Sequence, residues 1–207
     1  MNTTNLLQTI KYARLAHKDQ KRKNSAKDDY IVHAIDMADF IQDVALDLDI
    51  WERHIPTIQA TFLHDTVEDT TVTIQDIARN FGNEVAGIVS QVSDNKSLSK
   101  MERKMLQLKH ANTMSREAAI VKLADKWHNC RDLADDPPKG WTETQIMHYV
   151  YWSYKICKVI VEDWKSCDLI QIMWSRKVRP LFEEVHKVDD KLVDQIVAEY
   201  FEALKDE

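Results

Sequence analysis

A histidine and three acidic residues lie close together between residues 64 and 69. His64 and Asp65 are adjacent, and Glu68 and Asp69 follow four positions later. If the segment is helical, His64 shares a face with Glu68 and Asp65 with Asp69, because residues four apart are neighbours on a helix surface. One turn rises about 5.4 Å, enough for one pair to hold a metal ion while the other handles a water molecule. The second pair makes this segment more specific than an isolated His-Asp dipeptide.

Asp125 is a further candidate ligand, because it lies among apolar residues of a predicted helix. A carboxylate in such a place costs free energy unless it has a positive partner. Lys122 and Lys126 could be that partner, and so could a metal ion. The residues alone leave these alternatives open.

His33 follows Tyr30-Ile31-Val32 near the start of another predicted helix. Taken alone, a helical histidine is more often a core or surface residue than a ligand. Glu68 and Asp69 could likewise stabilise a helix end or a loop instead of acting in catalysis. The remaining histidines have no comparable neighbours and are expected to be structural or exposed: His17, His54, His110, His128, His148 and His186.

The elements that must position these residues are expected to be helices. Only three Gly and four Pro occur in 207 residues, which favours long helices with short connections. No stretch offers several consecutive strands with period-two alternation, so we predict an all-α protein. Helices are expected at residues 4–20 and 30–44, from residue 55 through 63 into the His64 motif, and at residues 73–82, 83–92, 100–109, 115–127, 142–156, 168–185 and 189–204.

Local signals set several of these boundaries. Capping boxes begin at Thr73 and Thr142, and Gly82 is a helix stop. Pro137-Pro138-Lys139-Gly140 is the clearest break in the chain, and Pro180 should bend or interrupt the helix around it. The apolar faces of the first two helices are predicted to be Leu7, Ile10, Ala13 and His17, and Ile31, Ile35, Ala38 and Ile41.

Length and composition predict an ordinary globular protein. We expect one domain over residues 1–207, with a core at about 6–159 and a C-terminal helical extension at about 160–207. No apolar run is long enough for a membrane span, and the first residues lack a signal pattern, so a cytoplasmic protein is expected. The three cysteines, Cys130, Cys157 and Cys167, are expected to be reduced and mostly buried thiols.

The net charge of −6 argues against a general nucleic-acid binder. Basic residues nevertheless form two groups, which are usually solvated faces but could also collect a polyphosphate substrate. The first group is Lys18, Lys21, Arg22 and Lys23, and the second is Lys96, Lys100, Arg103 and Lys104. Nothing in the sequence indicates the oligomeric state.

Three separated segments occur in the order and spacing of the HD-domain hydrolases. They are Tyr30-Ile31-Val32-His33, His64-Asp65-Thr66-Val67-Glu68-Asp69-Thr70 and Val121-Lys122-Leu123-Ala124-Asp125-Lys126. More narrowly, the sequence resembles the hydrolase half of RelA/SpoT proteins and their small stand-alone metazoan homologues. Residues 94–98, 102–104, 129–133 and 140–141 extend the resemblance, which covers about residues 6–159.

The resemblance implies an activity and a role for each matching residue. It implies Mn²⁺-dependent hydrolysis of guanosine 3′-diphosphate 5′-diphosphate (ppGpp) at the 3′ position, giving GDP and pyrophosphate. The alternatives are removal of the 2′-phosphate of NADPH at the same site, or a non-catalytic helical scaffold. The implied roles are Mn²⁺ binding for His33, His64, Asp65 and Asp125, water activation for Glu68 and Asp69, phosphate contacts for Arg22, Lys23 and Lys100, and nucleotide contacts for Asn129 and Tyr149.

The sequence departs from the family pattern outside the metal and acid residues. The loop at residues 24–29 lacks the usual Pro and Gly, and Val32 and Ala34 replace the Asn and Pro that flank the first histidine. Trp127-His128 and Gln145 are further differences. The departures therefore bear more on substrate preference than on the chemistry.

Overall fold

The computed structural model describes residues 3–48 and 54–206. Its elements in these ranges are helices, with one isolated antiparallel bridge between Lys21 and Asp29, which confirms the prediction of an all-α fold. The chain falls into two compact units. The first comprises Met1–Arg22, Ala26–Ser93 and Met114–Ala124, and the second comprises Lys23–Ser25, Asp94–Thr113 and Asp125–Glu207. The expected single domain over residues 1–207 stays a prediction.

The first unit is arranged around a short, almost fully buried helix. Its helices are α1 (Thr3–Ala16), α2 (Ile31–Asp47), α3 (Ile55–Leu63), α4 (Thr66–Asp69), α5 (Ile74–Phe81), α6 (Asn83–Val92) and the first part of α8 (Arg116–Asp135). Helix α3 packs against α1, α2 and α6. All its side chains from Thr57 to Leu63 are buried, as expected for a helix covered on every side.

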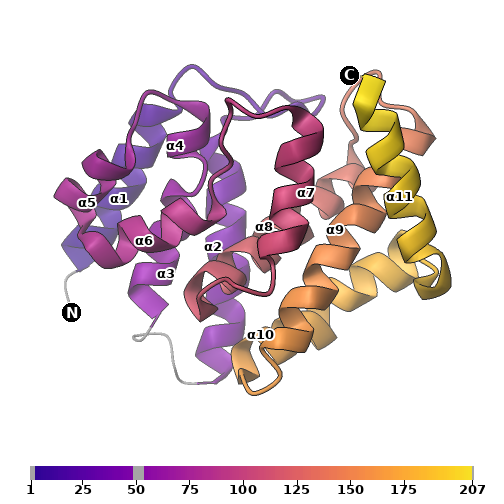
Figure 1. The fold of residues 1–207 in the computed structure, drawn as a ribbon. Helices are drawn as coiled ribbons and strands as arrows, with labels where there is room; N and C mark the ends of the chain where they lie inside the picture. Colours follow the sequence, from indigo (N-terminus) through magenta and orange to yellow (C-terminus); the bar gives the residue numbers. More distant parts are fainter. Residues whose placement is uncertain (1–2, 49–53, 207) are drawn as a thin grey trace. The chain divides into compact units, whose positions relative to one another are not determined.

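The second unit contains the longest helix of the described chain. It holds α7 (Lys100–His110), the rest of α8, α9 (Glu143–Asp163), α10 (Asp168–Met173), α11 (Val193–Ala203) and the short turns η4 (Asp190–Leu192) and η5 (Leu204–Asp206) (Figure 1). Helix α9 packs against α7 and α11. Its residue Trp152 is fully buried, and Tyr200 of α11 lies against the same indole ring at 6.3 Å between centroids.

Local chemistry explains most of the observed boundaries. The predicted capping boxes at Thr73 and Thr142 are both present, and a third occurs at Ser99, at the start of α7. Gly82 ends α5 at a φ of 91°, a conformation that side-chain-bearing residues rarely adopt. Ser115 caps the start of α8, because its hydroxyl oxygen accepts a hydrogen bond from the backbone N–H of Ala118 at 3.2 Å.

Two details of the first helices differ from the prediction. Helix α1 ends at Ala16, four residues before the predicted boundary. Leu7 is 68% exposed and Ile35 is 44% exposed, so neither belongs to the core. The buried face of α1 instead includes Thr9, whose hydroxyl accepts a hydrogen bond from Gln59 of α3 at 2.9 Å. The face that α1 buries therefore differs from the one that apolar periodicity predicted, and it includes a polar contact with the neighbouring helix α3.

Pro180 produces the predicted irregularity. The helical segment that begins with α10 continues as two π-helical turns, η2 (Trp174–Val178) and η3 (Leu181–Val185), on either side of Pro180. Arg179 donates its backbone N–H to Trp174, five residues back. Proline has no N–H and disturbs the regular helical ladder around it, so the widened turns occur where the sequence predicts a bend.

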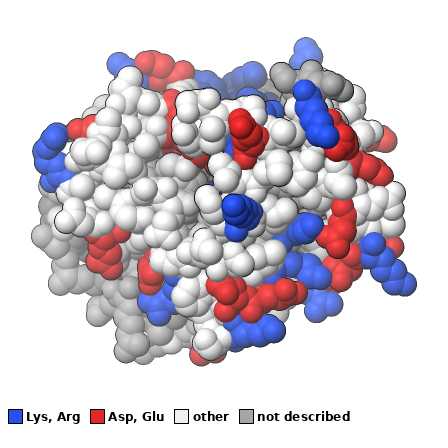
Figure 2. Space-filling view, in the orientation of Figure 1, with Lys and Arg blue, Asp and Glu red and all other residues white. Residues whose placement is uncertain are grey.

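The surface and the thiols agree with the composition. Figure 2 shows basic and acidic side chains interspersed on the face in view, as expected for a chain with a net charge of −6. Among the described residues, no helix combines the length and the apolar character that crossing a membrane requires. Cys130 and Cys157 are buried, Cys167 is half-buried, and all three are free thiols.

Candidate metal site

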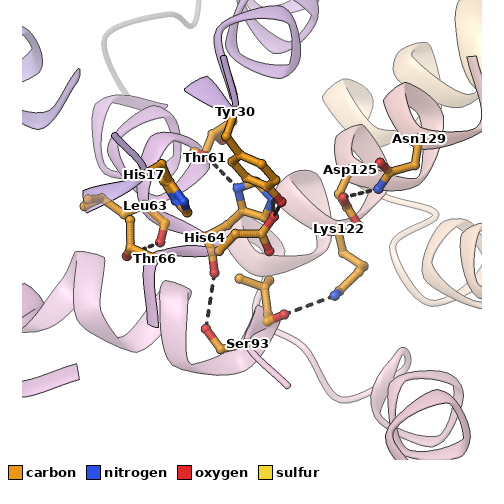
Figure 3. Close-up of polar contacts among 12 residues, drawn as sticks. His17, Tyr30, Thr61, Leu63, His64, Thr66, Ser93, Lys122, Asp125 and Asn129 are labelled. Carbon is orange, nitrogen blue, oxygen red and sulfur yellow. Dashed lines mark hydrogen bonds and ion pairs between the residues drawn. The ribbon is translucent and has the colours of Figure 1, made fainter. Parts of the chain in front are cut away.

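His64 is held in one orientation by the backbone of its own helix. It lies at the C-terminal end of α3, is buried, and its Nδ1 is 2.8 Å from the carbonyl oxygen of Thr61 (Figure 3). A carbonyl oxygen can only accept, so Nδ1 carries a hydrogen, and in the neutral ring Nε2 presents a lone pair. This arrangement is typical of histidines that bind metal ions.

Asp65 faces that lone pair. Its Oδ2 lies 3.0 Å from Nε2 of His64, and the hydroxyl of Tyr30 donates a short hydrogen bond to the same oxygen. A nitrogen lone pair and an anionic oxygen repel each other at this distance unless a proton or a cation lies between them. Imidazole and carboxylate are also a suitable donor pair for a divalent transition metal.

Tyr30 connects this pair to the loop at residues 21–29, which carries Lys21, Arg22 and Lys23 and is called the basic loop below. Its ring stacks on His17 at 4.6 Å between centroids, and the guanidinium carbon of Arg22 lies 5.8 Å from the ring centroid. Burial, followed by the charge of Asp65, raises the pKa of Tyr30 well above its ordinary value. The phenol therefore remains a hydrogen-bond donor to Asp65 at neutral pH.

Three of the four predicted ligands come together in one group. Each of His33 on α2, His64 and Asp125 on α8 offers one nitrogen or oxygen atom, and these atoms all lie within 4.8 Å of one another. All three residues are buried. Asp125 directly follows Ala124, the last residue of the first unit, within the unbroken helix α8. Asp65 adjoins the group through its 3.0 Å contact with His64.

Both oxygens of Asp125 accept hydrogen bonds. Asn129 donates its amide to Oδ1 at 2.6 Å, and the ammonium of Lys126 lies 3.1 Å from Oδ2. Burial by itself lowers the pKa of Lys126, but the charge of Asp125 outweighs it and the pKa is raised, so this side chain is an ammonium. Lys126 is thus one positive partner of Asp125, whereas Lys122 donates to the backbone carbonyl of Val92 at 3.1 Å.

The two candidate catalytic acids lie on α4, one turn after the His-Asp pair. Glu68 and Asp69 are both half-buried, and the backbone N–H of Asp69 donates to the carbonyl of Asp65 at 2.8 Å. This helical hydrogen bond places Asp65 and Asp69 on one face, as predicted. Gln20 further fixes the turn by donating its amide to the carbonyl of Asp69 at 2.6 Å.

The segment is not one continuous helix, however. His64 and Asp65 form a turn between α3 and α4. The hydroxyl of Thr66 donates to the carbonyl of Leu63 at 2.6 Å, and the hydroxyl of Ser93 donates to the carbonyl of His64 at 3.3 Å. Side-chain hydroxyls that bind backbone carbonyls compete with the helical ladder, which explains the break.

The predicted phosphate-binding residues lie on structured backbone. Lys21 and Asp29 close the basic loop through their bridge and a 2.5 Å ion pair, and the N–H of Arg22 donates to the carbonyl of Asp28 at 2.8 Å. These contacts order the loop without the Pro and Gly that the family usually has there. Lys23 is exposed, and so is Lys100 at the first position of α7.

The predicted nucleotide-binding residues lie in the second unit. Tyr149 is half-buried on α9, with its ring 5.9 Å from that of Trp141 and 5.4 Å from that of Trp152. Asn129 contacts Asp125, as described above. Sequence reasoning gave Tyr30 no role of its own and named Lys126 only as one of the possible partners of Asp125. Only the folded chain shows which carboxylate oxygen each of them contacts.

The sequence matches the HD domain family over residues 9–151. It is 40% identical to the guanosine-3′,5′-bis(diphosphate) 3′-pyrophosphohydrolase MESH1 of Xenopus tropicalis, over 74% of this chain and 83% of the relative. The Homo sapiens protein of the same name is 39% identical over the same shares. A solved structure of a metazoan ortholog of SpoT, described as hydrolysing ppGpp, matches with a TM-score of 0.77 and 30% identity. That match covers 89% of this chain and 97% of the solved chain.

The chain belongs to the HD-domain family. Within it, the similarity is to the small metazoan SpoT-like enzymes, as the motifs around His33, His64 and Asp125 predict. The structural match extends over more of this chain than the sequence matches do, 89% against 74%, so it includes residues that the sequence comparison does not reach.

Proposed function

We propose that this HD-domain phosphohydrolase cleaves ppGpp at its 3′ position, giving GDP and pyrophosphate, and that it uses Mn²⁺. The observation that carries the proposal is the buried group of His33, His64 and Asp125, for which the family resemblance implies metal binding. The activity printed in the names of the MESH1 relatives supports the substrate. Their similarity covers 83% of each relative, so it includes most of the length of these enzymes.

The residues fit a divalent metal ion. Two imidazoles and one carboxylate converge within 4.8 Å, and the Nδ1 hydrogen bond of His64 leaves its other nitrogen to a ligand. Asp65 would complete the set, with its orientation fixed by Tyr30. Imidazole and carboxylate donors suit Mn²⁺ among other first-row metals. When bound, the metal would lower the pKa of a water molecule and neutralise charge on phosphoryl oxygens.

The other residues of the site would position water and substrate. Glu68 and Asp69 would hold the attacking water in line and accept its proton, since α4 places them directly after the His-Asp turn. Arg22 and Lys23 would offset the negative charge of the substrate. Asn129 would contact the nucleotide, and its amide donates the hydrogen bond that orients Asp125.

Product analysis tests this proposal. Purified protein with Mn²⁺ is incubated separately with ppGpp and with NADPH, and the products are separated by anion-exchange chromatography. We expect equal amounts of GDP and pyrophosphate from ppGpp. Release of inorganic phosphate from NADPH, with no GDP from ppGpp, would assign the same site to a 2′-phosphatase. No product from either nucleotide would contradict an enzymatic role.

A further inference from the structure

Lys126 is a buried ammonium that touches a candidate metal ligand. Its side chain is 3% exposed, and its Nζ lies 3.1 Å from Oδ2 of Asp125. The two residues are adjacent on α8, and Asn129 of the same helix binds the other oxygen of the carboxylate at 2.6 Å. A fixed positive charge at this place opposes the binding of a divalent cation, because like charges repel strongly where water is excluded. The ion pair therefore needs a functional explanation.

The rings of Trp152 and Tyr149 pack against the ammonium of Lys126, which contacts Asp125. Nζ of Lys126 lies 4.6 Å from the ring centroid of Trp152 and 5.8 Å from that of Tyr149. The indole is itself fixed, because its N–H donates to the carbonyl of Lys104 at 3.1 Å. The ammonium of Lys104 lies on the same indole at 4.2 Å. Cation–π contacts within about 6 Å are attractive, and they are stronger in desolvated places such as this one.

This arrangement keeps Lys126 from extending into water. Long basic side chains usually bury their stems and expose their charged ends. Here the end of the chain is enclosed by the carboxylate and two rings, and Trp152 is fully buried. The position of the charge is therefore set by the contacts of Lys126 with Asp125 and with the rings of Trp152 and Tyr149.

We propose that Lys126 is a positioning residue that serves as an internal counter-cation for Asp125. It neutralises the carboxylate and fixes its orientation when no metal is bound. It also lowers the affinity for the divalent ion, because the ion must share Asp125 with a positive charge that cannot move away. This inference rests on the metal site of the proposed function.

Calorimetric titration of Mn²⁺ into metal-free protein tests the inference without measuring turnover. We expect Lys126→Met to bind Mn²⁺ about tenfold more tightly than the wild type, because the like charge is gone. Lys126→Arg should restore wild-type affinity, since it keeps the charge. Lys104→Met is the matched control. It removes the same charge from the same indole ring and leaves the ion pair of Lys126 and Asp125 in place, so its affinity should stay close to that of the wild type.

Unchanged or weaker Mn²⁺ binding by Lys126→Met would make this lysine merely structural and would overturn the inference. If the metal-free variant does not fold, melting curves of protein prepared with Mn²⁺ give the answer. The inference then predicts that added Mn²⁺ raises the Tm of the variant more than that of the wild type, and an equal or smaller rise overturns it. Absence of Mn²⁺ binding by the wild type would instead overturn the proposed metal site, and this inference with it.

Discussion

The surroundings of His64 and of Asp125 stabilise candidate metal ligands in different ways. His64 and Asp65 are held by neutral groups, the carbonyl of Thr61 and the hydroxyl of Tyr30. Asp125 is held by an amide and by the charge of Lys126. Neutral hydrogen bonds orient a ligand and leave its charge to the metal, whereas an ion pair also compensates that charge before any metal arrives. From this difference we expect the turn of His64 and Asp65 to determine the geometry of the metal ligands, and the ion pair on α8 to determine the affinity for the metal.

The largest expected effect comes from removing a ligand on the neutral side. His64→Ala should lose Mn²⁺ binding and turnover together. Loss of an outer partner of a metal site costs about 10- to 100-fold, so loss of a ligand should exceed 100-fold. Metal content by mass spectrometry and GDP release by chromatography measure the two effects. If the variant kept both its Mn²⁺ and its turnover, His64 would not be a metal ligand, and the comparison of its surroundings with those of Asp125 would fail.

A smaller but still large effect should separate catalysis from metal binding. Glu68→Gln combined with Asp69→Asn should lower turnover by about 10²- to 10⁴-fold, the usual contribution of a general acid or base. Mn²⁺ affinity should stay near that of the wild type, because these side chains follow the His64–Asp65 pair on α4 and the converging group of ligand atoms comes from His33, His64 and Asp125. If the double variant loses its metal, the acids are ligands and the division of roles is wrong.

Tyr30→Phe sharpens the comparison by removing only a hydroxyl. The ring that stacks on His17 is kept, while Asp65 loses its hydrogen-bond donor. We expect Mn²⁺ to bind roughly tenfold more weakly, the low end of the range for outer partners of metal sites. The expected change is opposite in sign to that of Lys126→Met. If Mn²⁺ affinity changed in the same direction and by the same factor in both variants, the neutral and the charged surroundings would have the same effect on metal binding.

The smallest effect should come from the basic loop. Arg22→Ala with Lys23→Ala should raise KM for ppGpp about tenfold, in line with the roughly 1.5 kcal/mol expected for a hydrogen bond to a charged group. Because exposed charges are screened by salt, KM of the wild type should rise with ionic strength and that of the variant should rise less. Steady-state rates over a range of NaCl concentrations check this. Equal salt dependence with unchanged KM would return the loop to an ordinary solvated surface.

The sequence predicted those parts of the fold that depend on local chemistry. Helix α6 begins and ends at the predicted residues. The capping box at Thr73 starts the preceding helix α5, and Gly82 ends α5 immediately before α6 begins. Leu7 and Ile35 were placed wrongly in the core because apolar periodicity does not say which face a neighbouring helix covers. In the candidate site, the family resemblance predicted which residues would converge, and the residues alone left the partner of Asp125 open between two lysines and a metal ion. The contact of Tyr30 with Asp65 could not be predicted, because it depends on the distance between separate elements.

The central claim is that one buried site, built on His33, His64 and Asp125, binds the metal that ppGpp hydrolysis requires. Metal-free protein titrated with Mn²⁺, with bound metal and GDP formation measured in the same samples, tests it most directly. The account predicts that activity rises from zero and saturates at one Mn²⁺ per chain. GDP formation that is independent of added metal, or saturation of binding with no GDP formed, would contradict it.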